Sequence, residues 1–280
     1  MDTVLLVDGS NLLFQMFYGM PSKIPGPDGK DIRGTLGFLG ALLKIVRQVH
    51  PTHIAVLFDG ECHNARTDVD ADYKANRPDF SAMAEEELPF SQLPHIYRGL
   101  DHLDIRYAET TDCETDDWMA AYAAALGPET QLVISSYDSD FFQLISDRVR
   151  ILRYRGENTR ICDRAWLREA LGIEPEQYAA FKALTGDNSD NLRGVPKVGP
   201  KTAAALLRQF GDLESLIAGV DEIAKPSIRR AVAENLPRLR TNYQLIRLLP
   251  GAPLPFQPEE LRFSYHGETT TEVLRAIGLR

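Results

Sequence analysis

Short hydrophobic stretches that each end at an acidic residue are the feature of this sequence that most constrains its fold. Residues 3–8 (TVLLVD) and 53–59 (HIAVLFD) are rich in aliphatic and β-branched residues and stop at an aspartate. Residues 105–109 (IRYAE) form a weaker stretch of the same kind, and residues 131–136 (QLVISS) are followed by YDSD. Their length and composition predict β-strands, as they do for residues 148–154 (RVRILRY).

Stretches with helical spacing of apolar residues lie between these strands, at residues 35–49 (TLGFLGALLKIVRQV) and 114–126 (ETDDWMAAYAAAL). Strands that alternate with helices predict an α/β fold with a mostly parallel central sheet flanked by helices. Beyond about residue 175 the strand signals stop and helical patterns follow. We therefore predict an α/β domain over residues 1–170 and a helical region over residues 171–280. Within the latter, residues 251–260 (GAPLPFQPEE) are expected to be a linker or extended segment before a last short helix.

The composition excludes a disordered chain and a transmembrane protein. Hydrophobic residues make up 44% of the 280 residues, which is enough for a packed core, and no apolar stretch is long enough to span a bilayer. The N-terminus starts a strand rather than a signal peptide. Three scattered cysteines, Cys62, Cys113 and Cys162, fit neither a zinc site nor a disulfide framework, so we expect a cytoplasmic protein.

Acidic residues at the carboxyl ends of parallel strands converge on the crevice where such sheets bind ligands. The candidate metal ligands are Asp8, Asp59, Glu114, Asp116, Asp117, Asp138, Asp140, Asp187 and Asp190. So many carboxylates share a site unprotonated only when cations lie among them. Oxygen ligands without a histidine or cysteine cluster favour Mg²⁺ or Mn²⁺ over zinc. The net charge of −9 does not exclude a nucleic-acid partner, because bound cations would offset part of it.

Each acidic motif also has an ordinary structural interpretation. Acids in ETDD favour the dipole of the helix that they begin, although Glu114 and Asp117 share a face and could reach one cation. Asp138 could be a helix N-cap, and Asp8 could begin an Asp-Gly turn. The interpretation as a metal site comes from their joint occurrence, together with Asp59, at the ends of predicted strands.

The string GDNSDNLRGVPKVGPKTA, at residues 186–203, predicts a glycine-rich hairpin between two helices. Gly194 and Gly199 allow tight turns, and the helix that follows exposes its first N–H groups near Lys201 and Thr202. Such a helix end binds a phosphate oxygen without reading base sequence. The alternative is an ordinary helix-turn-helix corner.

Residues 60–111 are the least regular part of the α/β domain. They are either a mobile excursion near an active site or a surface loop with a solvated helix. Arg66, Lys74 and Arg77 lie there, and a solvated charged face is the usual interpretation of such a loop. Beside a carboxylate site they would instead clamp a phosphodiester, and Tyr73 would stack on a base.

Taken in order, the blocks VDGSN, FDG, YKANRP, ETDD, SSYDSD and GDNSDNLRGVPKVGPKTA resemble the 5′-nuclease superfamily. That superfamily includes the 5′→3′ exonuclease domain of bacterial DNA polymerase I, phage 5′-exonucleases and flap endonucleases. The resemblance covers most of the chain and implies a PIN-like α/β fold with a C-terminal helix-hairpin-helix. It implies a stand-alone, monomeric, structure-dependent 5′→3′ exonuclease or flap endonuclease of DNA replication and repair. The implied substrates are DNA duplexes with a 5′ end, a nick or a flap, and the implied cofactors are two or more Mg²⁺ or Mn²⁺ ions.

The resemblance also implies a role for each candidate residue. Lys74 and Arg77 would act in catalysis by contacting the scissile phosphate beneath an arch within residues 60–111, and Arg66 would be a further DNA backbone contact. The tighter metal site would involve Asp8, Asp59, Glu114, Asp116 and Asp138, and the second metal would be held by Asp140, Asp187 and Asp190, with Asp116 and Asp117 near both. The hairpin would grip the duplex through Gly194, Gly199, Lys201 and Thr202, and it would hold a K⁺ ion on the backbone carbonyls of Val195 and Val198.

Two features depart from the family's pattern. Gln15 stands where the family often has an arginine, and the arch carries Glu85, Glu86 and Glu87 instead of many lysines. Two rival functions stay open: a DNA-structure-binding module without hydrolysis, and a PIN-like ribonuclease. A Ser-His-Asp hydrolase lacks its GxSxG motif here, and an Asp-nucleophile phosphatase would need a DxD motif where Ser10 stands.

Overall fold

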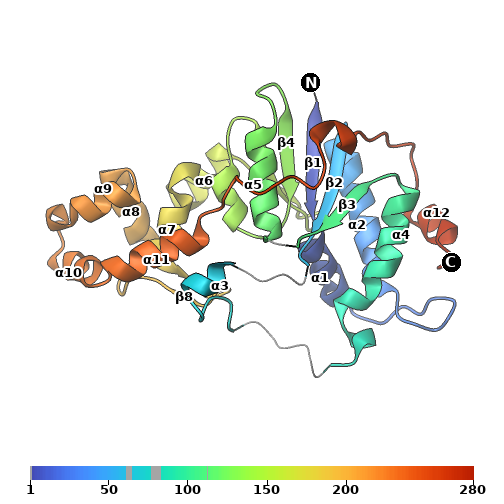
Figure 1. The fold of residues 1–280 in the computed structure, drawn as a ribbon, viewed down its shortest axis with the longest axis horizontal. Coiled ribbons are helices and arrows are strands. Elements are labelled where there is room, and N and C mark those ends of the chain that lie inside the picture. The colour runs from blue at the N-terminus through green and yellow to red at the C-terminus, as the bar shows by residue number, and fades with distance from the viewer. Residues whose placement is uncertain (1, 61–64, 77–82, 112) are drawn as a thin grey trace.

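The computed structural model describes residues 2–60, 65–76, 83–111 and 113–280. Its central sheet has six strands in the order β3-β2-β1-β4-β5-β6, and Figure 1 labels β1 to β4 of this sheet. The strands are β1 (Thr3–Asp8), β2 (His53–Phe58), β3 (Arg106–Glu109), β4 (Gln131–Ser135), β5 (Val149–Arg153) and β6 (Arg160–Cys162). Neighbours from β3 to β5 are parallel, and β6 runs antiparallel to β5. The prediction of a mostly parallel sheet is therefore confirmed, whereas the short edge strand β6 had no clear sequence signal.

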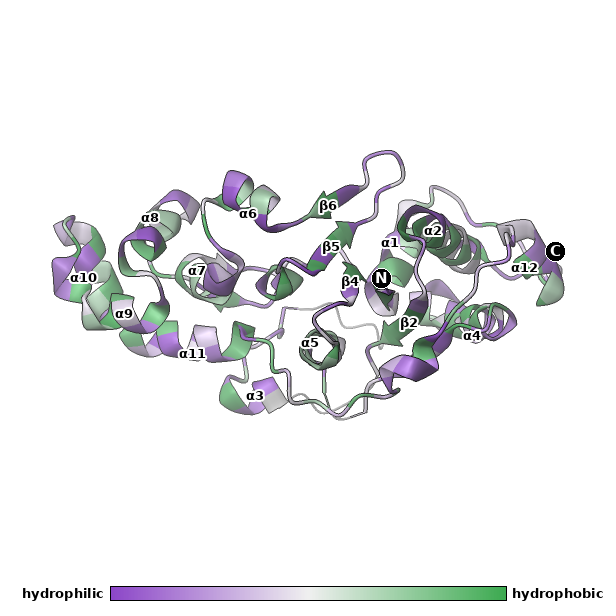
Figure 2. Ribbon diagram, turned by 90° about the horizontal axis from the view of Figure 1, so that it is seen from above, coloured by the Kyte–Doolittle hydropathy of each residue, from purple (hydrophilic) through white to green (hydrophobic). Residues whose placement is uncertain are grey.

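Helices cover both faces of the sheet (Figure 2). One face carries α1 (Gly9–Gly19), α2 (Arg33–Val49), α4 (Leu93–His102) and α12 (Thr270–Ala276), and the other carries α5 (Thr115–Ala125). The other helices are α3 (Ala65–Val69), α6 (Arg164–Leu171), α7 (Tyr178–Thr185), α8 (Pro200–Phe210), α9 (Leu213–Ala218), α10 (Pro226–Glu234) and α11 (Leu236–Ile246). The helices predicted at residues 35–49 and 114–126 are α2 and α5.

Alternate side chains of β1 enter two different hydrophobic clusters. Leu5 and Val7 belong to the cluster that contains Phe38 of α2, whereas Leu6 belongs to the cluster that contains Met119 of α5. This follows from the two-residue period of a strand, and a strand covered on both faces needs apolar residues at every position. Burying both faces fixes β1 at the centre of the sheet, so that the carboxyl ends of its parallel neighbours open at the same edge.

The hydrophobic cluster beneath α5 continues into the C-terminal helices. It runs from Met119 through Phe141, in the 3₁₀ turn η3 (Asp140–Leu144), to Phe181 of α7 and Leu245 of α11. The predicted α/β and helical regions therefore share part of one core, which fixes the helical region beside the carboxyl edge of the sheet. Their division at about residue 170 stays a prediction.

A short β-ladder interrupts the helical region. Gly186–Asp187 (β7) and Leu192–Arg193 (β8) pair antiparallel, an element that the helical patterns beyond residue 175 did not indicate. The backbones approach very closely: a Cβ atom on Gly194 would lie 2.3 Å from the carbonyl carbon of Thr185. Gly186 has a φ of 81°, which favours glycine. Glycines at both positions therefore allow the ladder to form.

After α11 the chain returns across α5 to the sheet (Figure 1). Tyr122 of α5 donates its hydroxyl hydrogen to the Phe256 carbonyl at 2.8 Å, and the Phe263 N–H donates to the Thr52 carbonyl at 2.9 Å. The 3₁₀ turn η6 (Pro258–Leu261) lies between them, and α12 then packs against α2 and α4. The predicted last short helix is thus confirmed. None of the helices that the structure describes has both the length and the apolar composition needed to cross a bilayer.

Candidate metal centre

Asp8 and Asp59 lie where β1 and β2 end, at the edge where the parallel strands open. Asp8 caps α1: its Oδ1 accepts from the Asn11 N–H at 2.9 Å, and its Oδ2 accepts from Ser136 Oγ at 2.8 Å. Asp59 Oδ1 accepts from the Thr115 N–H of α5 at 3.1 Å. Burial, and after it the charge of Asp59, raises the pKa of Asp8 to about 7 despite its hydrogen bonds. The two strand ends therefore bring their carboxylates into mutual repulsion.

Asp116 joins these acids from the first turn of α5. Burial raises the pKa of its carboxyl group well above the ordinary value, and the charges of Asp138, Glu114 and Asp59 raise it further, in that order. We call Asp8, Asp59, Glu114, Asp116 and Asp138 the first carboxylate group. Among the described residues, no three of these acids place single oxygens within 4.8 Å of one another.

A second carboxylate group consists of Asp140, Asp187 and Asp190. One oxygen from each lies within 4.8 Å of the other two, and all three residues are buried. Asp140 comes from η3, whereas Asp187 and Asp190 come from the turn around the short β7–β8 ladder. Within the part of the chain that the structure describes, this is the group of acids with the spacing that a single cation requires.

The two groups meet at Asp138 and Asp140. Asp138 Oδ1 accepts from the Asp140 N–H at 2.8 Å. Asp140 Oδ1 is buried without a hydrogen-bond partner and has only an ion pair with Lys182 Nζ at 3.4 Å. Burial, followed by the charge of Asp138, raises the pKa of Asp140 to about 7. A buried carboxylate oxygen that lacks a donor, among other carboxylates, fits a divalent cation with oxygen ligands.

Arg66 and Lys74 hold one side of the first group. Arg66 of α3 reaches Glu114 at 2.5 Å and binds both oxygens of Asp117, at 2.8 and 3.1 Å, while Lys74 Nζ bonds the other oxygen of Glu114. Asp117 also accepts from the Leu249 N–H at 3.1 Å. The structure thus directs Asp117 toward Arg66 and Leu249, which follows α11, and not into either carboxylate group.

Lys182 is a residue of the site that sequence reasoning missed. It lies on α7, bonds Asp187 Oδ2 and approaches Asp140 Oδ1 at 3.4 Å. Burial tends to lower its pKa, but the charges of Asp140 and Asp187 raise it above the ordinary value of a lysine. The available signal was a single lysine among the apolar residues of the helical pattern EQYAAFKALTG, five positions before Asp187. A charge there needs a buried partner of opposite sign.

The glycine-rich hairpin connects β8 to α8. Within it the Val198 N–H donates to the Val195 carbonyl at 3.1 Å, and Lys197 adopts a φ of 68°. Gly199 is the N-cap of α8. Gly199, Pro200, Lys201 and Thr202 line an open hollow of about 420 Å³. The first turn of α8 therefore faces solvent, as a phosphate contact requires, while the K⁺ site stays a prediction.

The remaining residues singled out in the sequence are Tyr73, Arg77, Gln15 and Glu85–Glu87. Tyr73 is only 5% exposed, with Lys74 Nζ 4.8 Å from its ring centre, so in this conformation its faces are covered and base stacking stays a prediction. Arg77 lies outside the described residues. Gln15 donates to the Tyr154 carbonyl at 2.8 Å, which ties α1 to the end of β5. Glu85–Glu87 form a 3₁₀ turn.

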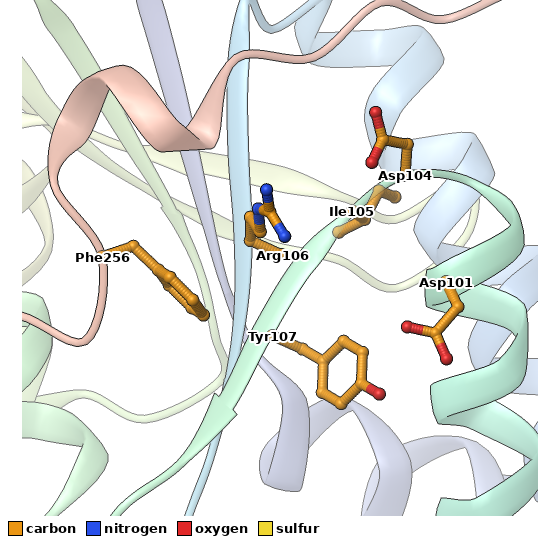
Figure 3. A pocket seen from close by; sticks show the side chains of 6 residues that line it. All are labelled: Asp101, Asp104, Ile105, Arg106, Tyr107 and Phe256. Carbon is orange, nitrogen blue, oxygen red and sulfur yellow. The ribbon is translucent and has the colours of Figure 1, made fainter.

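A smaller hollow, of about 200 Å³, lies at the amino-terminal end of β3 (Figure 3). Its lining includes Asp101, Asp104, Arg106, Tyr107 and Phe256, which come from the end of α4, the start of β3 and the returning C-terminal segment. The candidate metal ligands lie at the opposite, carboxyl ends of the strands. This hollow is therefore separate from the carboxylate groups.

An acid-lined carboxyl edge on a parallel sheet, with a helical region and a glycine-rich hairpin beside it, defines a class of α/β protein suited to holding cations at a phosphate. Two family models match this chain. The "5′-3′ exonuclease, N-terminal resolvase-like domain" matches residues 3–172, and the "5′-3′ exonuclease, C-terminal SAM fold" matches residues 173–268. The protein belongs to the 5′-3′ exonuclease family.

Relatives of two sizes are similar to the chain. A protein of Streptomyces coelicolor named 5′-3′ exonuclease is 32% identical, with 99% of this chain and 95% of that protein covered. DNA polymerase I of Rhizobium leguminosarum is 35% identical over 93% of this chain but only 26% of its own length. The thermostable DNA polymerase I of Thermus aquaticus is 34% identical over 98% of this chain and 31% of its own length. The chain thus spans a third or less of these polymerases.

Solved structures show the same fold at lower identity. The T5 5′-exonuclease with bound zinc ions has a TM-score of 0.70 and 21% identity, with 89% of this chain and 90% of that chain covered. The catalytic core of Rad2 in complex with DNA substrate has a TM-score of 0.62 and 15% identity, with 99% of this chain and 85% of that chain covered. These likenesses confirm the predicted fold class.

Proposed function

We propose that the protein is a structure-dependent 5′→3′ exonuclease or flap endonuclease that hydrolyses DNA phosphodiesters with Mg²⁺ or Mn²⁺. One observation carries the proposal: two carboxylate groups, joined through Asp138 and Asp140, lie at one edge of the sheet with several of their pKa values raised by burial and mutual repulsion. Family membership agrees with it. Divalent ions held by the two groups would supply Lewis-acid stabilisation of an in-line displacement at phosphorus.

The chain's own residues account for the rest of the chemistry. The carboxylates of the two groups hold the ions, and Lys74 lies beside the first group, where its ammonium can exchange Glu114 for a scissile phosphate. A water molecule is the nucleophile: its oxygen forms the new bond to phosphorus as it loses a proton, while the bond to the 3′ oxygen breaks and that oxygen takes up a proton. The products are a 5′-phosphate and a 3′-hydroxyl. Arg77 is proposed to assist Lys74.

The helical region is proposed to grip the duplex. The exposed first turn of α8, with Lys201 and Thr202, offers N–H groups and a positive charge to a backbone phosphate. Arg66 is proposed as a further contact, and the Val195 and Val198 carbonyls as ligands of K⁺. Such contacts read the shape of a nick, a 5′ end or a flap rather than base sequence. We further propose a cytoplasmic monomer acting in replication and repair.

The test uses the purified chain with Mg²⁺ or Mn²⁺ and labelled substrates: a 5′-flap duplex, a nicked duplex, single-stranded DNA and a matched RNA. We expect cleavage of the DNA substrates with 5′ ends or flaps, and loss of cleavage with a chelator. Asp138→Asn should remove cleavage but not DNA binding, whereas Asp147→Asn, at a fully exposed aspartate, should leave both unchanged. Folded protein that binds flaps but cuts none of them would indicate the binding module instead, and a preference for RNA would indicate the ribonuclease.

A further inference from the structure

Lys74 has an unusual backbone conformation, and a residue of the second carboxylate group holds it there. Its φ is 58°, in the left-handed region that lysine rarely adopts. Its backbone N–H donates to the carbonyl oxygen of Asp190 at 3.1 Å. A non-glycine residue persists in this region only where surrounding contacts determine it. The contact therefore links the backbone of Lys74 to that of a candidate metal ligand.

Two asparagine side chains add hydrogen bonds on either side of this contact. Asn191 Nδ2 donates to the Asp72 carbonyl at 2.8 Å, and Asn76 Nδ2 donates to the Asn188 carbonyl at 2.7 Å. The partners are 119 and 112 positions apart in the chain. Residues 72–76, which we call the lysine segment, are thus joined to residues 187–191, which we call the ligand turn, by hydrogen bonds in both directions.

The ligand turn is itself ordered by local bonds. Asp187 Oδ1 accepts from the Ser189 N–H at 2.9 Å, and Asn191 adopts a φ of 59°, which asparagine tolerates better than most residues. Shortly before the lysine segment, Arg66 donates to the Leu245 carbonyl of α11 at 3.0 Å and pairs with Glu114 and Asp117. The ligand turn supplies the backbone hydrogen bond to Lys74 itself and the hydrogen bonds at Asp72 and Asn76 on either side of it.

We propose that Asn76 and Asn191 are positioning residues, which fix Lys74 beside the carboxylates by holding the lysine segment on the ligand turn. The inference rests on the proposed nuclease function and goes beyond it, because both amides donate to backbone carbonyls, of Asn188 and Asp72, and not to the carboxylate groups' side-chain oxygens. It makes the placement of Lys74 dependent on the turn that carries Asp187 and Asp190. Both cation-binding and phosphate-contacting groups then move as one unit.

The first experiment measures docking without any reaction. Trypsin cleaves after Lys74, whereas Arg77 is followed by Pro78 and is spared, so cleavage of the Lys74–Ala75 bond is readily identified by mass. Asn191→Gly removes the amide and keeps the left-handed backbone accessible, and Asn76→Ala removes the other amide. In the metal-free protein we expect each variant to be cut roughly two- to tenfold faster at this bond, the range for losing one net hydrogen bond. Asn158→Ala, at an exposed asparagine in the β5–β6 turn, should match the parent.

The second experiment asks whether docking acts through Lys74. On a 5′-flap substrate with Mg²⁺, Asn76→Ala and Asn191→Gly should each lower kcat roughly two- to tenfold with KM unchanged. In a Lys74→Ala background the same substitutions should cause no further loss, because the group that they position is absent. A merely structural role would instead lower the rate equally in both backgrounds.

The outcomes of the two experiments decide whether Asn76 and Asn191 position Lys74. Faster trypsin cleavage with an unchanged kcat, an equal loss in the Lys74→Ala background, or parental rates in both experiments would overturn the inference. A parent protein that cuts none of the DNA substrates would refute the proposed function instead, and the trypsin comparison would still report whether the two segments are docked. The two failures are thus distinguishable.

Discussion

Asp140→Asn is expected to stabilise the metal-free protein while destroying its response to Mg²⁺. Asp140 is only 6% exposed, and its pKa is raised to about 7, first by burial and then by the charge of Asp138. The ion pair with Lys182 offsets only part of this effect. Asparagine has nearly the same shape but no charge, so the substitution removes the repulsion without opening a cavity.

The magnitude follows from the pKa of this one group. A folded-state pKa of about 7, against the ordinary value of 3.8, corresponds to about 4 kcal/mol of destabilisation once the carboxyl is ionised in both states. Relaxation of the site and loss of the Lys182 contact reduce the gain, so we expect roughly 2 kcal/mol or more at about pH 8. The sign is fixed: the destabilisation grows as the pH rises from about 4 to about 7. The advantage of the variant should therefore shrink as the pH falls toward 5.

Urea denaturation in a chelator, at about pH 8 and about pH 5, measures both quantities. Asp147→Asn is the control, because a fully exposed aspartate should change the unfolding free energy by less than about 0.5 kcal/mol. Adding Mg²⁺ should stabilise the parent by mass action and Asp140→Asn much less. A variant less stable than the parent at high pH in chelator, or an advantage that does not depend on pH, would refute the electrostatic reasoning.

Three further changes test other parts of the structure. Lys182→Met removes the internal cation of the second carboxylate group and should raise the affinity for Mn²⁺ roughly tenfold by calorimetry; unchanged or weaker binding would contradict this role. Gly60→Ala would place a Cβ atom 2.1 Å from the Thr110 carbonyl oxygen, and it should lower the unfolding free energy by about 2 kcal/mol or more in urea, an expectation that a parental midpoint would exclude. Lys201→Ala should weaken flap binding uniformly across sequences and reduce the slope of log affinity against log salt by about 1, and an unchanged slope would remove Lys201 from the phosphate contacts.

Much of the fold could be predicted because its signals are local. The stretches that form β1, β2, β4 and β5 are short and apolar. The stretches that form α2 and α5 carry apolar residues at helical spacing. The helix α1 was missed because it begins at Gly9, directly after β1, and its residues 12–19 (LLFQMFYG) are apolar nearly throughout. The edge strand β6 is three residues long, which is too short to show a period.

The sequence by itself determined which residues carry charge at the strand ends and which glycines could turn tightly, because these depend on residue type and on neighbours a few positions away. Only the tertiary structure decided which charges meet. Asp117 turns to Arg66, Lys182 reaches Asp140 and Asp187, and the lysine segment rests on the ligand turn. The strand order and the return of the C-terminal segment to β2 are of the same kind. Contacts between residues over a hundred positions apart produce no periodic pattern in a single sequence. They form only when the helices pack on both faces of the sheet and bring these residues together.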